Sequence, residues 1–323
     1  MRPQLFGTLF YANYLTRALA LYRSLEAHFA QPFTLVALCM DEFAEVILRE
    51  LDLPHIRILR IGELEARFPE LARVKPTRSI GEYSWTCTPA LMRYMLAEVA
   101  AGESVAYLDA DLMFFSDPQP VFDEWGDNDI LIHEHRYAPQ HRHMIPTSGT
   151  FNVGLVAIRN APQGARCLQR WHDQCIEICV LDGTRGLCGD QGYLDEWPQL
   201  YERVTILQHK GAGLAPWNIE QYALSDREPV VCVDRAPLIF YHYHAFRWLG
   251  AFLGRALVVP SLGYDFTLLQ LRLIYRPYVA ALATAERSAR ATKAGAGLPQ
   301  PRLGGDEKGA WRRWRMFNTR SRS

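Results

Sequence analysis

Residues 105–118 read VAYLDADLMFFSDP, a short apolar run that delivers two aspartates one residue apart, Asp109 and Asp111. The run has the length and composition of a buried strand. Ligands of open α/β sheets bind at the carboxyl ends of the strands, and a hard divalent cation is the usual partner of two neighbouring carboxylates. The stretch therefore predicts an α/β fold with a metal site where this strand ends, and such a cation can hold a diphosphate.

The spacing alone is a weak motif. The chain contains 16 Asp, so about one such pair is expected by chance. Asp127 and Asp129 form a second pair, but they follow Gly126 and precede the apolar run 130–132, so we interpret them as a turn that enters a strand. A solvated turn is also the alternative for Asp109 and Asp111. We favour metal binding there because the predicted strand stops at that point.

Composition limits the class of protein. The 323 residues are 49% hydrophobic and 22% charged, as in soluble globular proteins. The net charge of zero conceals a basic tail, because residues 286–323 hold ten Lys or Arg and three Asp or Glu. The remaining body is acidic, which argues against general nucleic-acid binding. We find no signal peptide and no membrane span, and the odd number of cysteines, seven, fits reduced thiols in a cytoplasm.

Strand and helix patterns alternate through the first 110 residues. Apolar runs predict strands at 5–10, 33–39, 56–61 and 104–108. Helical spacing predicts helices at 14–28, at 42–51 with Asp41 as the cap, and at 90–99 with Thr88 as the cap. This alternation is typical of a mostly parallel sheet with helices on both faces.

The second half has a mixed pattern. Apolar runs predict short strands at 130–133, 151–158, 204–207, 230–233 and 238–243, and a helix at 167–181. Residues 264–289 have the periodicity of one amphipathic helix, which Pro277 should kink or break.

Four later segments turn the aspartate pair into a pattern. They are TSGTFNVG at 147–154, GDQGYL at 189–194, GAGLAPWN at 211–218 and IFYHYHAFR at 239–247. In this order the chain resembles the GT-A-fold glycosyltransferases, most closely the retaining, family 8-like group and its bacterial relatives, over residues 4–250. The resemblance implies a mixed, mostly parallel central sheet flanked by helices, in a catalytic domain at 1–255. An amphipathic helical extension at 256–290 and a basic flexible tail at 291–323 follow.

The resemblance also implies a metal site. Asp109 and Asp111 match the DxD motif of the family, and His242 matches the histidine that completes the metal site. His244 is the alternative ligand, since two-residue alternation would place it on the same strand face. Imidazole in this set favours Mn²⁺ over Mg²⁺.

Further site residues follow from the same resemblance. Asp190 and Gln191 match the Asp-Gln pair near the anomeric carbon and are the expected catalytic residues, although Asp190 could also cap a helix. The expected contacts of the nucleotide-sugar donor are Thr8, Tyr11, Arg93, Asp109, Asn152, Trp217, Asn218 and Arg247. For Arg93 a solvated helix position is the alternative, and for Asn152 a buried strand start.

The chain departs from the family pattern at two places. Relatives carry an acidic residue near the end of the first strand to read the base, where this chain has residues 8–11, TLFY. Tyr11 could stack on the base, but the carboxylate that would recognise uracil is missing. After the His-aromatic segment Ala245 and Arg247 replace the usual Gly and Lys, and Arg247 could grip a diphosphate bidentately.

The expected reaction is metal-dependent transfer of a sugar from a nucleoside-diphosphate sugar, UDP-sugar first, to an acceptor hydroxyl with retention. The acceptor stays open among a sugar, a glycolipid and a protein, and the histidine-rich stretch 133–143 is either an acceptor surface or a plain exposed loop. The alternatives are an inactive GT-A-like carbohydrate-binding or scaffold protein and a sugar-nucleotidyltransferase. A sugar-nucleotidyltransferase normally has a Gly-rich loop that binds a triphosphate, and residues 6–10 do not form such a loop.

The tail adds an expectation about location. Residues 311–317 read WRRWRMF, and interleaved aromatic and basic residues are typical of segments that lie on anionic membranes. We expect a cytoplasmic protein with peripheral contact at the inner face of the membrane, in bacterial surface glycan or glycolipid synthesis. A disordered soluble tail is the alternative.

Overall fold

A seven-stranded sheet forms the centre of the computed structural model, which describes residues 4–183, 185–227, 230–248, 255–258, 264–298 and 316–318. The strand order is β10-β6-β7-β4-β1-β2-β3. These strands are β1 (Gln4–Phe10), β2 (Phe33–Cys39), β3 (Ile56–Arg60), β4 (Ser104–Leu108), β6 (Ile130–Glu134), β7 (Phe151–Arg159) and β10 (Val204–Ile206). Within this sheet β7 runs antiparallel to β4 and β6, and the other pairs are parallel. The start of β7 therefore lies at the same edge as the carboxyl ends of the other strands.

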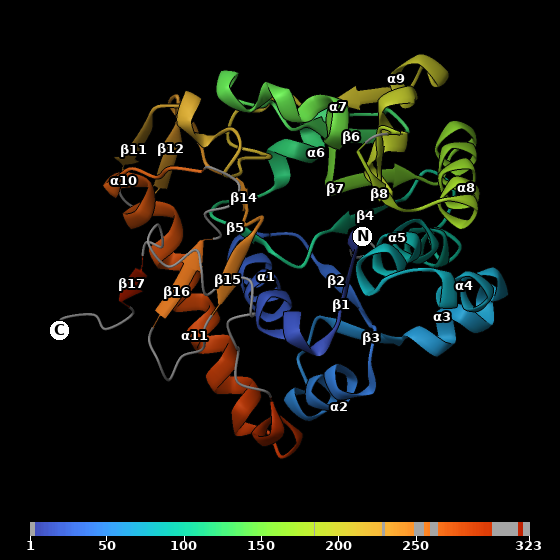
Figure 1. The fold of residues 1–323 in the computed structure, drawn as a ribbon, viewed down its shortest axis with the longest axis horizontal. Coiled ribbons are helices and arrows are strands. Elements are labelled where there is room, and N and C mark those ends of the chain that lie inside the picture. Colours follow the sequence, from blue (N-terminus) through green and yellow to red (C-terminus); the bar gives the residue numbers. More distant parts are fainter. Residues whose placement is uncertain are drawn as a thin grey trace.

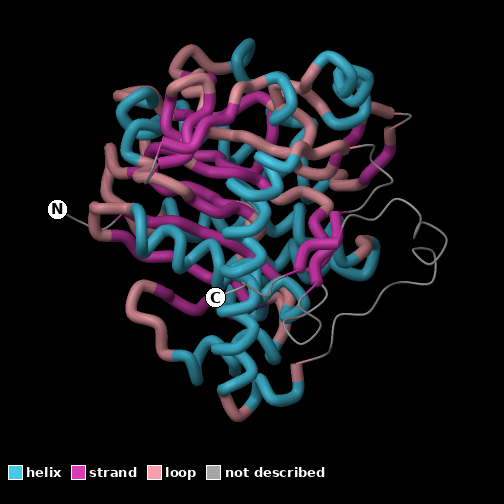
Figure 2. Tube along the Cα trace, turned by 90° about the vertical axis from the view of Figure 1, so that its left-hand side faces the viewer, coloured by secondary structure: helices cyan, strands magenta, loops and turns pink. Residues whose placement is uncertain are grey.

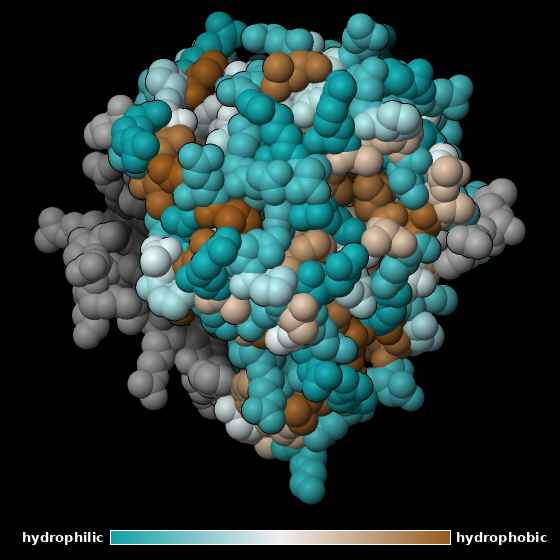
Figure 3. All heavy atoms as spheres, turned by 90° about the vertical axis from the view of Figure 1, so that its right-hand side faces the viewer, coloured by the Kyte–Doolittle hydropathy of each residue, from teal (hydrophilic) through white to brown (hydrophobic). Residues whose placement is uncertain are grey.

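Helices lie on both sides of this sheet (Figures 1 and 2). Alternate side chains of β1 enter different cores, as strand geometry requires: Leu5 and Leu9 join residues of α5 (Ile80–Leu96), whereas Phe6 joins residues of α1 (Leu15–His28). The other helices of this part are α2 (Glu42–Leu51), α3 (Ile61–Arg67), α4 (Pro69–Val74), α6 (Gln119–Trp125), α7 (Ile145–Ser148), α8 (Pro162–Glu177) and α9 (Trp197–Leu200). Figure 3 shows the outer face on the side of α3, α4, α5 and α8 as mostly hydrophilic, with separate small apolar areas.

A second strand pairing brings the C-terminal half to the aspartate motif. β5 (Leu112–Phe114) pairs antiparallel with β14 (Phe240–His242), and His242 lies opposite Leu112. The remaining short strands are β8 (Leu181–Asp182), β9 (Leu187–Cys188), β11 (Leu224–Arg227), β12 (Val230–Val233), β13 (Ala236–Pro237), β15 (Phe246–Trp248), β16 (Arg255–Val258) and β17 (Met316–Asn318).

The C-terminal helical run supports β14. It consists of α10 (Leu268–Gln270), a π-helical turn (Leu271–Tyr275) and α11 (Arg276–Ala291). The ring of Tyr243 stacks on Tyr278 of α11 with centroids 3.5 Å apart, and its hydroxyl donates to the carbonyl of Ile274 at 2.8 Å. Tyr241 and Tyr275 join their hydroxyls at 3.0 Å. Both neighbours of His242 thus face the helical run.

Several predicted elements are confirmed to the residue. β2, α2, β4 and β12 begin and end as predicted, and Asp41 accepts from the Ala44 N–H at 2.8 Å as the cap of α2. The second aspartate pair is structural, because Asp129 is buried and forms an ion pair with Arg203 at 2.8 Å.

Three helix boundaries differ from the prediction. Thr88 is not a cap, because α5 begins at Ile80 after a capping box on Ser79; Tyr83 continues the buried face toward that end. α8 starts at Pro162 and ends at Glu177, since proline favours the first helical turn. The predicted interruption at Pro277 is a π-helical turn directly before it, and the helical run continues without a break into α11.

No described helix has the length and apolar character needed to cross a bilayer. The aromatic and basic segment 311–317 lies outside the described residues, apart from the backbone of its last two positions in β17.

Candidate active site

Three side chains able to bind a metal converge where β4 ends. One ligand atom from each of Asp109, Asp111 and His242 lies within 4.8 Å of the other two. The Nε2 atom of His242 is 3.2 Å from Asp111 Oδ1 and 3.7 Å from Asp109 Oδ2. The β5–β14 pairing explains this meeting, because it places His242 beside the strand that directly follows Asp111. We call these three residues the triad.

The triad is open to solvent on the Asp109 side. The side chain of Asp109 is 31% exposed to solvent, whereas those of Asp111 and His242 are 15% and 7% exposed. A ligand can therefore approach Asp109. Burial raises the pKa of Asp109, and the negative charge of Asp111 adds to this. Burial also opposes ionisation of Asp111, but the charge and hydrogen bond of His242, together with the charges of Arg17 and His244, hold the pKa of Asp111 below its usual value.

His242 responds in the opposite sense. Burial disfavours its charged form, but the carboxylates, Asp111 above all, raise the pKa of His242. A cation bound here would compensate the charge of the two acids, and His242 would bind it as the neutral imidazole. Two carboxylates and an imidazole are a suitable donor set for Mn²⁺, so the residues present fit the metal that the family implies.

Asp190 and Gln191 lie at the same edge. Asp190 is only 4% exposed, and burial together with the charge of Asp109 raises the pKa of Asp190 to about 8. Asp190 is the N-cap residue of the 3₁₀ helix Gln191–Glu196, as the cap interpretation expected, but its side chain makes no cap hydrogen bond. The amide of Gln191 accepts from Asn152 Nδ2 at 2.8 Å and donates to the carbonyl of Ser148 at 2.7 Å.

Two other predicted residues border the triad. Asn152 Oδ1 lies 3.2 Å from His242 Nδ1. The ring of Trp217 stands edge-on to both His242 and His244, with centroids 5.4 Å away. His244 follows β14, which ends at His242, and it is not one of the three residues of the triad. Its ring lies beside that of His242 with centroids 6.2 Å apart, and its charge acts on Asp111. Its place as the alternative metal ligand stays a prediction.

The remaining predicted donor contacts have different surroundings. Thr8 is fully buried inside β1, and Tyr11 is half-buried directly after that strand. Arg93 lies over the ring of Phe68 at 4.9 Å, near the charges of Asp173 and Glu70 rather than at the triad.

Asn218 is fully buried. Its amide donates to the carbonyls of His135 and Gly213 at 2.8 and 2.9 Å, and accepts from the Ala215 N–H at 3.0 Å, so it fixes its own loop. Arg247 is exposed in β15.

Two residues beside the triad were not among the predicted site residues. The hydroxyl of Tyr107 donates to Asp109 Oδ1 at 3.0 Å; strand alternation puts the two on one face and could have revealed this. Arg17 is buried in α1 and donates to the carbonyl of Phe246 at 2.9 Å. Its charge contributes, after that of His242, to the low pKa of Asp111. The signal for Arg17 was its position as a charged residue within the otherwise uncharged run 15–22.

The histidine-rich stretch is not a plain exposed loop. His133, His135 and His141 are buried, and burial lowers the pKa of both His133 and His135 to about 3. The Nε2 atom of His135 lies 3.3 Å from Asn152 Nδ2. The neutral imidazoles of His133 and His135 thus lie near Asn152.

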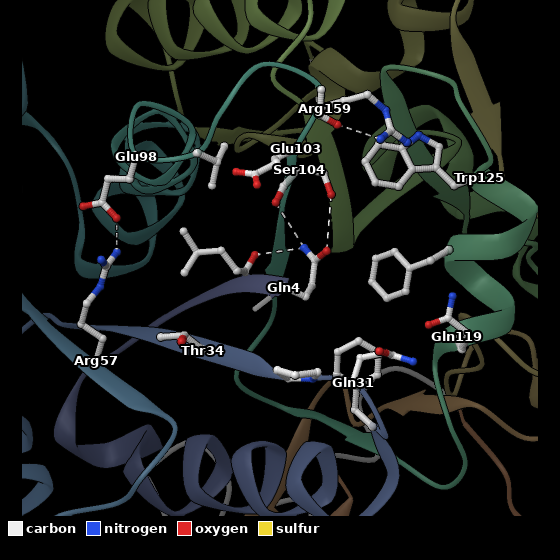
Figure 4. Close-up of a pocket in the computed structure, with 16 residues that line it drawn as sticks. Gln4, Gln31, Thr34, Arg57, Glu98, Glu103, Ser104, Gln119, Trp125 and Arg159 are labelled. Carbon is white, nitrogen blue, oxygen red and sulfur yellow. Dashed lines mark hydrogen bonds and ion pairs between the residues drawn. The ribbon is translucent and has the colours of Figure 1, made fainter. Parts of the chain in front are cut away.

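A cavity of about 680 Å³ lies at the opposite edge of the sheet (Figure 4). Its wall includes Gln4, Thr34, Arg57 and Ser104 near the starts of β1 to β4, and Arg159 at the end of β7. Arg57 points to Glu98 and pairs with it at 2.6 Å. The cavity contains no residue of the triad, so it is not part of the candidate active site.

Comparisons with known proteins identify the family and the fold. A family model described as nucleotide-diphospho-sugar transferase matches residues 33–176. Two uncharacterized proteins of Bacillus subtilis (strain 168) are similar in sequence. YfnD is 32% identical over 243 residues, which cover 75% of this chain and 77% of YfnD. YfnF is 31% identical over 240 residues, which cover 72% and 78%.

A crystal structure of the galactosyltransferase LgtC, in complex with donor and acceptor sugar analogs, has a similar fold. The TM-score is 0.50 at 15% sequence identity, over 95% of this chain and 99% of LgtC. The mixed, mostly parallel sheet flanked by helices is thus the GT-A arrangement.

Proposed function

The chain belongs to the nucleotide-diphospho-sugar transferase family and is a glycosyltransferase, and we propose that it uses a divalent metal to move a sugar from a nucleoside-diphosphate sugar to an acceptor hydroxyl with retention. The observation that carries this proposal is the convergence of Asp109, Asp111 and His242 within 4.8 Å. The position of the triad at the carboxyl end of β4 supports it, since ligands of such sheets bind there.

The difficult step is the departure of an anionic diphosphate. Asp109, Asp111 and His242 would hold Mn²⁺ or Mg²⁺, which supplies a Lewis acid for the charge that develops on the leaving group. The exposed side of Asp109 leaves room for the diphosphate to approach. Tyr107 orients Asp109 through its hydroxyl, so the carboxylate is held before the ligand arrives.

Asp190 and Gln191 are the residues proposed to stabilise the positive charge at the anomeric carbon. Only ionised Asp190 can do this fully, and its raised pKa has two causes, burial and the charge of Asp109. A cation bound to Asp109 would compensate its negative charge. The pKa of Asp190 would then be raised by burial alone, which favours ionisation of Asp190. Retention would leave the departing phosphate to accept the proton of the acceptor hydroxyl. We propose UDP-sugars as the first donors to test, with a sugar, glycolipid or protein as acceptor.

The test is hydrolysis of a panel of nucleotide sugars, with and without Mn²⁺. Wild-type protein should release the diphosphate from at least one donor only when the metal is present, and Asp111→Asn should not. Asp127→Asn is the matched control, since it changes an exposed aspartate of the other Asp-x-Asp pair and should behave as wild type. Binding of donors without turnover of any would instead support an inactive scaffold, and NMR of a product with inverted configuration would exclude retention.

Membrane contact through residues 311–317 stays a prediction. Pelleting of the full chain with anionic liposomes, but not of a chain that ends at Leu298, is the result it predicts. Equal pelleting of both chains would contradict it.

A further inference from the structure

The first residues of β7, Asn152 to Gly154, touch two members of the triad. We infer that Asn152 and Gly154 are positioning residues: Asn152 fixes the ring of His242 with Nε2 toward the carboxylates, and Gly154 leaves the space that this arrangement needs. The inference rests on the proposed function in one respect, that the triad binds a divalent cation.

The orientation of the Asn152 amide follows from its neighbours. Its Oδ1 accepts from the backbone N–H of Gly154 at 2.9 Å, which identifies that atom as the oxygen. The same oxygen lies 3.2 Å from His242 Nδ1. An amide oxygen only accepts, so Nδ1 carries the proton. Nε2, which faces Asp109 and Asp111, is then the atom left to bind a metal, and such contacts to the second ring nitrogen orient metal-binding histidines.

Gly154 is required by space rather than by backbone conformation. A Cβ atom at this position would lie 2.6 Å from Asn152 Oδ1 and 2.9 Å from His242 Nδ1, which would separate the two. The carbonyl of Gly154 also accepts from the Asp109 N–H at 2.9 Å. One glycine therefore sets the backbone of one metal ligand and makes room for the ring of another.

Asn152 also connects the triad to the proposed catalytic pair. Its Nδ2 donates to Gln191 Oε1 at 2.8 Å, while its Oδ1 serves His242. The position therefore needs an acceptor on one side and a donor on the other, which an amide supplies. Aspartate would keep the acceptor and lose the donor. Substitution by aspartate can thus separate the contact with His242 from the contact with Gln191.

The experiment measures Mn²⁺ binding to the full chain by electron paramagnetic resonance, without donor. Wild type should bind Mn²⁺ with ¹⁴N coupling from an imidazole, and His242→Ala should lose that coupling. Asn152→Ala and Gly154→Ala should bind Mn²⁺ about 10- to 100-fold more weakly, with the coupling reduced. Asn152→Asp should retain the Mn²⁺ affinity and the ¹⁴N coupling of wild type. Gln191→Ala should retain them too, because it removes only the hydrogen bond between Asn152 Nδ2 and Gln191.

Asn128→Ala is the control for general damage, since it removes an amide hydrogen bond to Thr205 at 2.9 Å at the other end of β6. It should leave Mn²⁺ binding unchanged. Asn152→Ser takes the place of Asn152→Ala if the latter does not fold. Wild-type affinity and coupling in Asn152→Ala would overturn the inference and leave the proposed function intact, as would an Asn152→Asp variant as weak as Asn152→Ala. A wild type that binds no Mn²⁺ would overturn both.

Discussion

Replacing Asp190 with asparagine should stabilise the metal-free protein at pH 8 much more than at pH 5. Asp190 is 4% exposed, and burial with the charge of Asp109 raises the pKa of its carboxyl group from 3.8 to about 8. Because the folded-state pKa exceeds the unfolded-state value, the contribution of this group to stability is complete below pH 3.8 and is lost as the pH rises through 8. Asparagine does not titrate, so the variant lacks this loss.

The size of the effect follows from linkage. One pKa unit corresponds to about 1.4 kcal/mol, so between pH 5 and pH 8 the wild type should lose on the order of 3 kcal/mol through Asp190. Contributions of other groups cancel when the variant is compared with the wild type. The hydroxyl of Thr88, which hydrogen-bonds Asp190, can donate equally to an asparagine oxygen, so the packing is retained.

The assay is urea unfolding in EDTA at the two pH values. The free energy of unfolding of Asp190→Asn should fall less than that of wild type, by roughly 3 kcal/mol, whereas Asp127→Asn, an exposed aspartate, should follow the wild type. Donor turnover with Mn²⁺ should be lost in Asp190→Asn. If wild type and Asp190→Asn lose the same free energy between pH 5 and pH 8, Asp190 is not a buried, destabilising acid and the reasoning fails.

Three further predictions follow from the same contacts. Asp111→Asn should lower metal-dependent donor turnover on the order of 10³-fold, as loss of other electrostatic stabilisers does, and activity within tenfold of wild type would contradict its role. Tyr278→Ala removes the ring stacked on Tyr243; it should cost about 3–5 kcal/mol in urea unfolding and weaken Mn²⁺ binding, and unchanged affinity would show that α11 does not support His242. Burial holds the pKa of His133 at about 3, below its ordinary 6.5, so the unfolded state takes up the proton first and stability falls as the pH drops below 6.5. His133→Asn should reduce that loss by about 1.4 kcal/mol per pH unit between pH 6 and pH 4, and an equal loss in both proteins would refute it.

The strands and helices of the first half could be predicted because their signals are local. β2 and β4 are continuous apolar runs, and Asp41 caps α2 with a side chain three residues from its donor. The start of α5 was predicted too late because Thr88 has the side chain of a helix cap, whereas the buried face of the helix extends back to Tyr83.

Site residues that directly follow a strand could be predicted from sequence, but contacts between segments far apart in the chain could not. Asp109 and Asp111 come directly after β4, but their meeting with His242 depends on a pairing between β5 and β14, which only motif order in a family suggests. The choice between His242 and His244 has the same origin, since both rings contact Trp217 and only the fold shows which of them meets Asp109 and Asp111. Arg17 could not be placed beside Asp111 from sequence, because its backbone partner Phe246 is equally remote.

Anomalous diffraction at the manganese edge, from crystals grown with Mn²⁺ and a nucleoside diphosphate, tests the central claim most directly. We predict one ion bonded to a carboxylate oxygen of Asp109, a carboxylate oxygen of Asp111 and Nε2 of His242, and in contact with the diphosphate. A bound nucleotide with no ion between these three side chains, or an ion held by other residues, would contradict it.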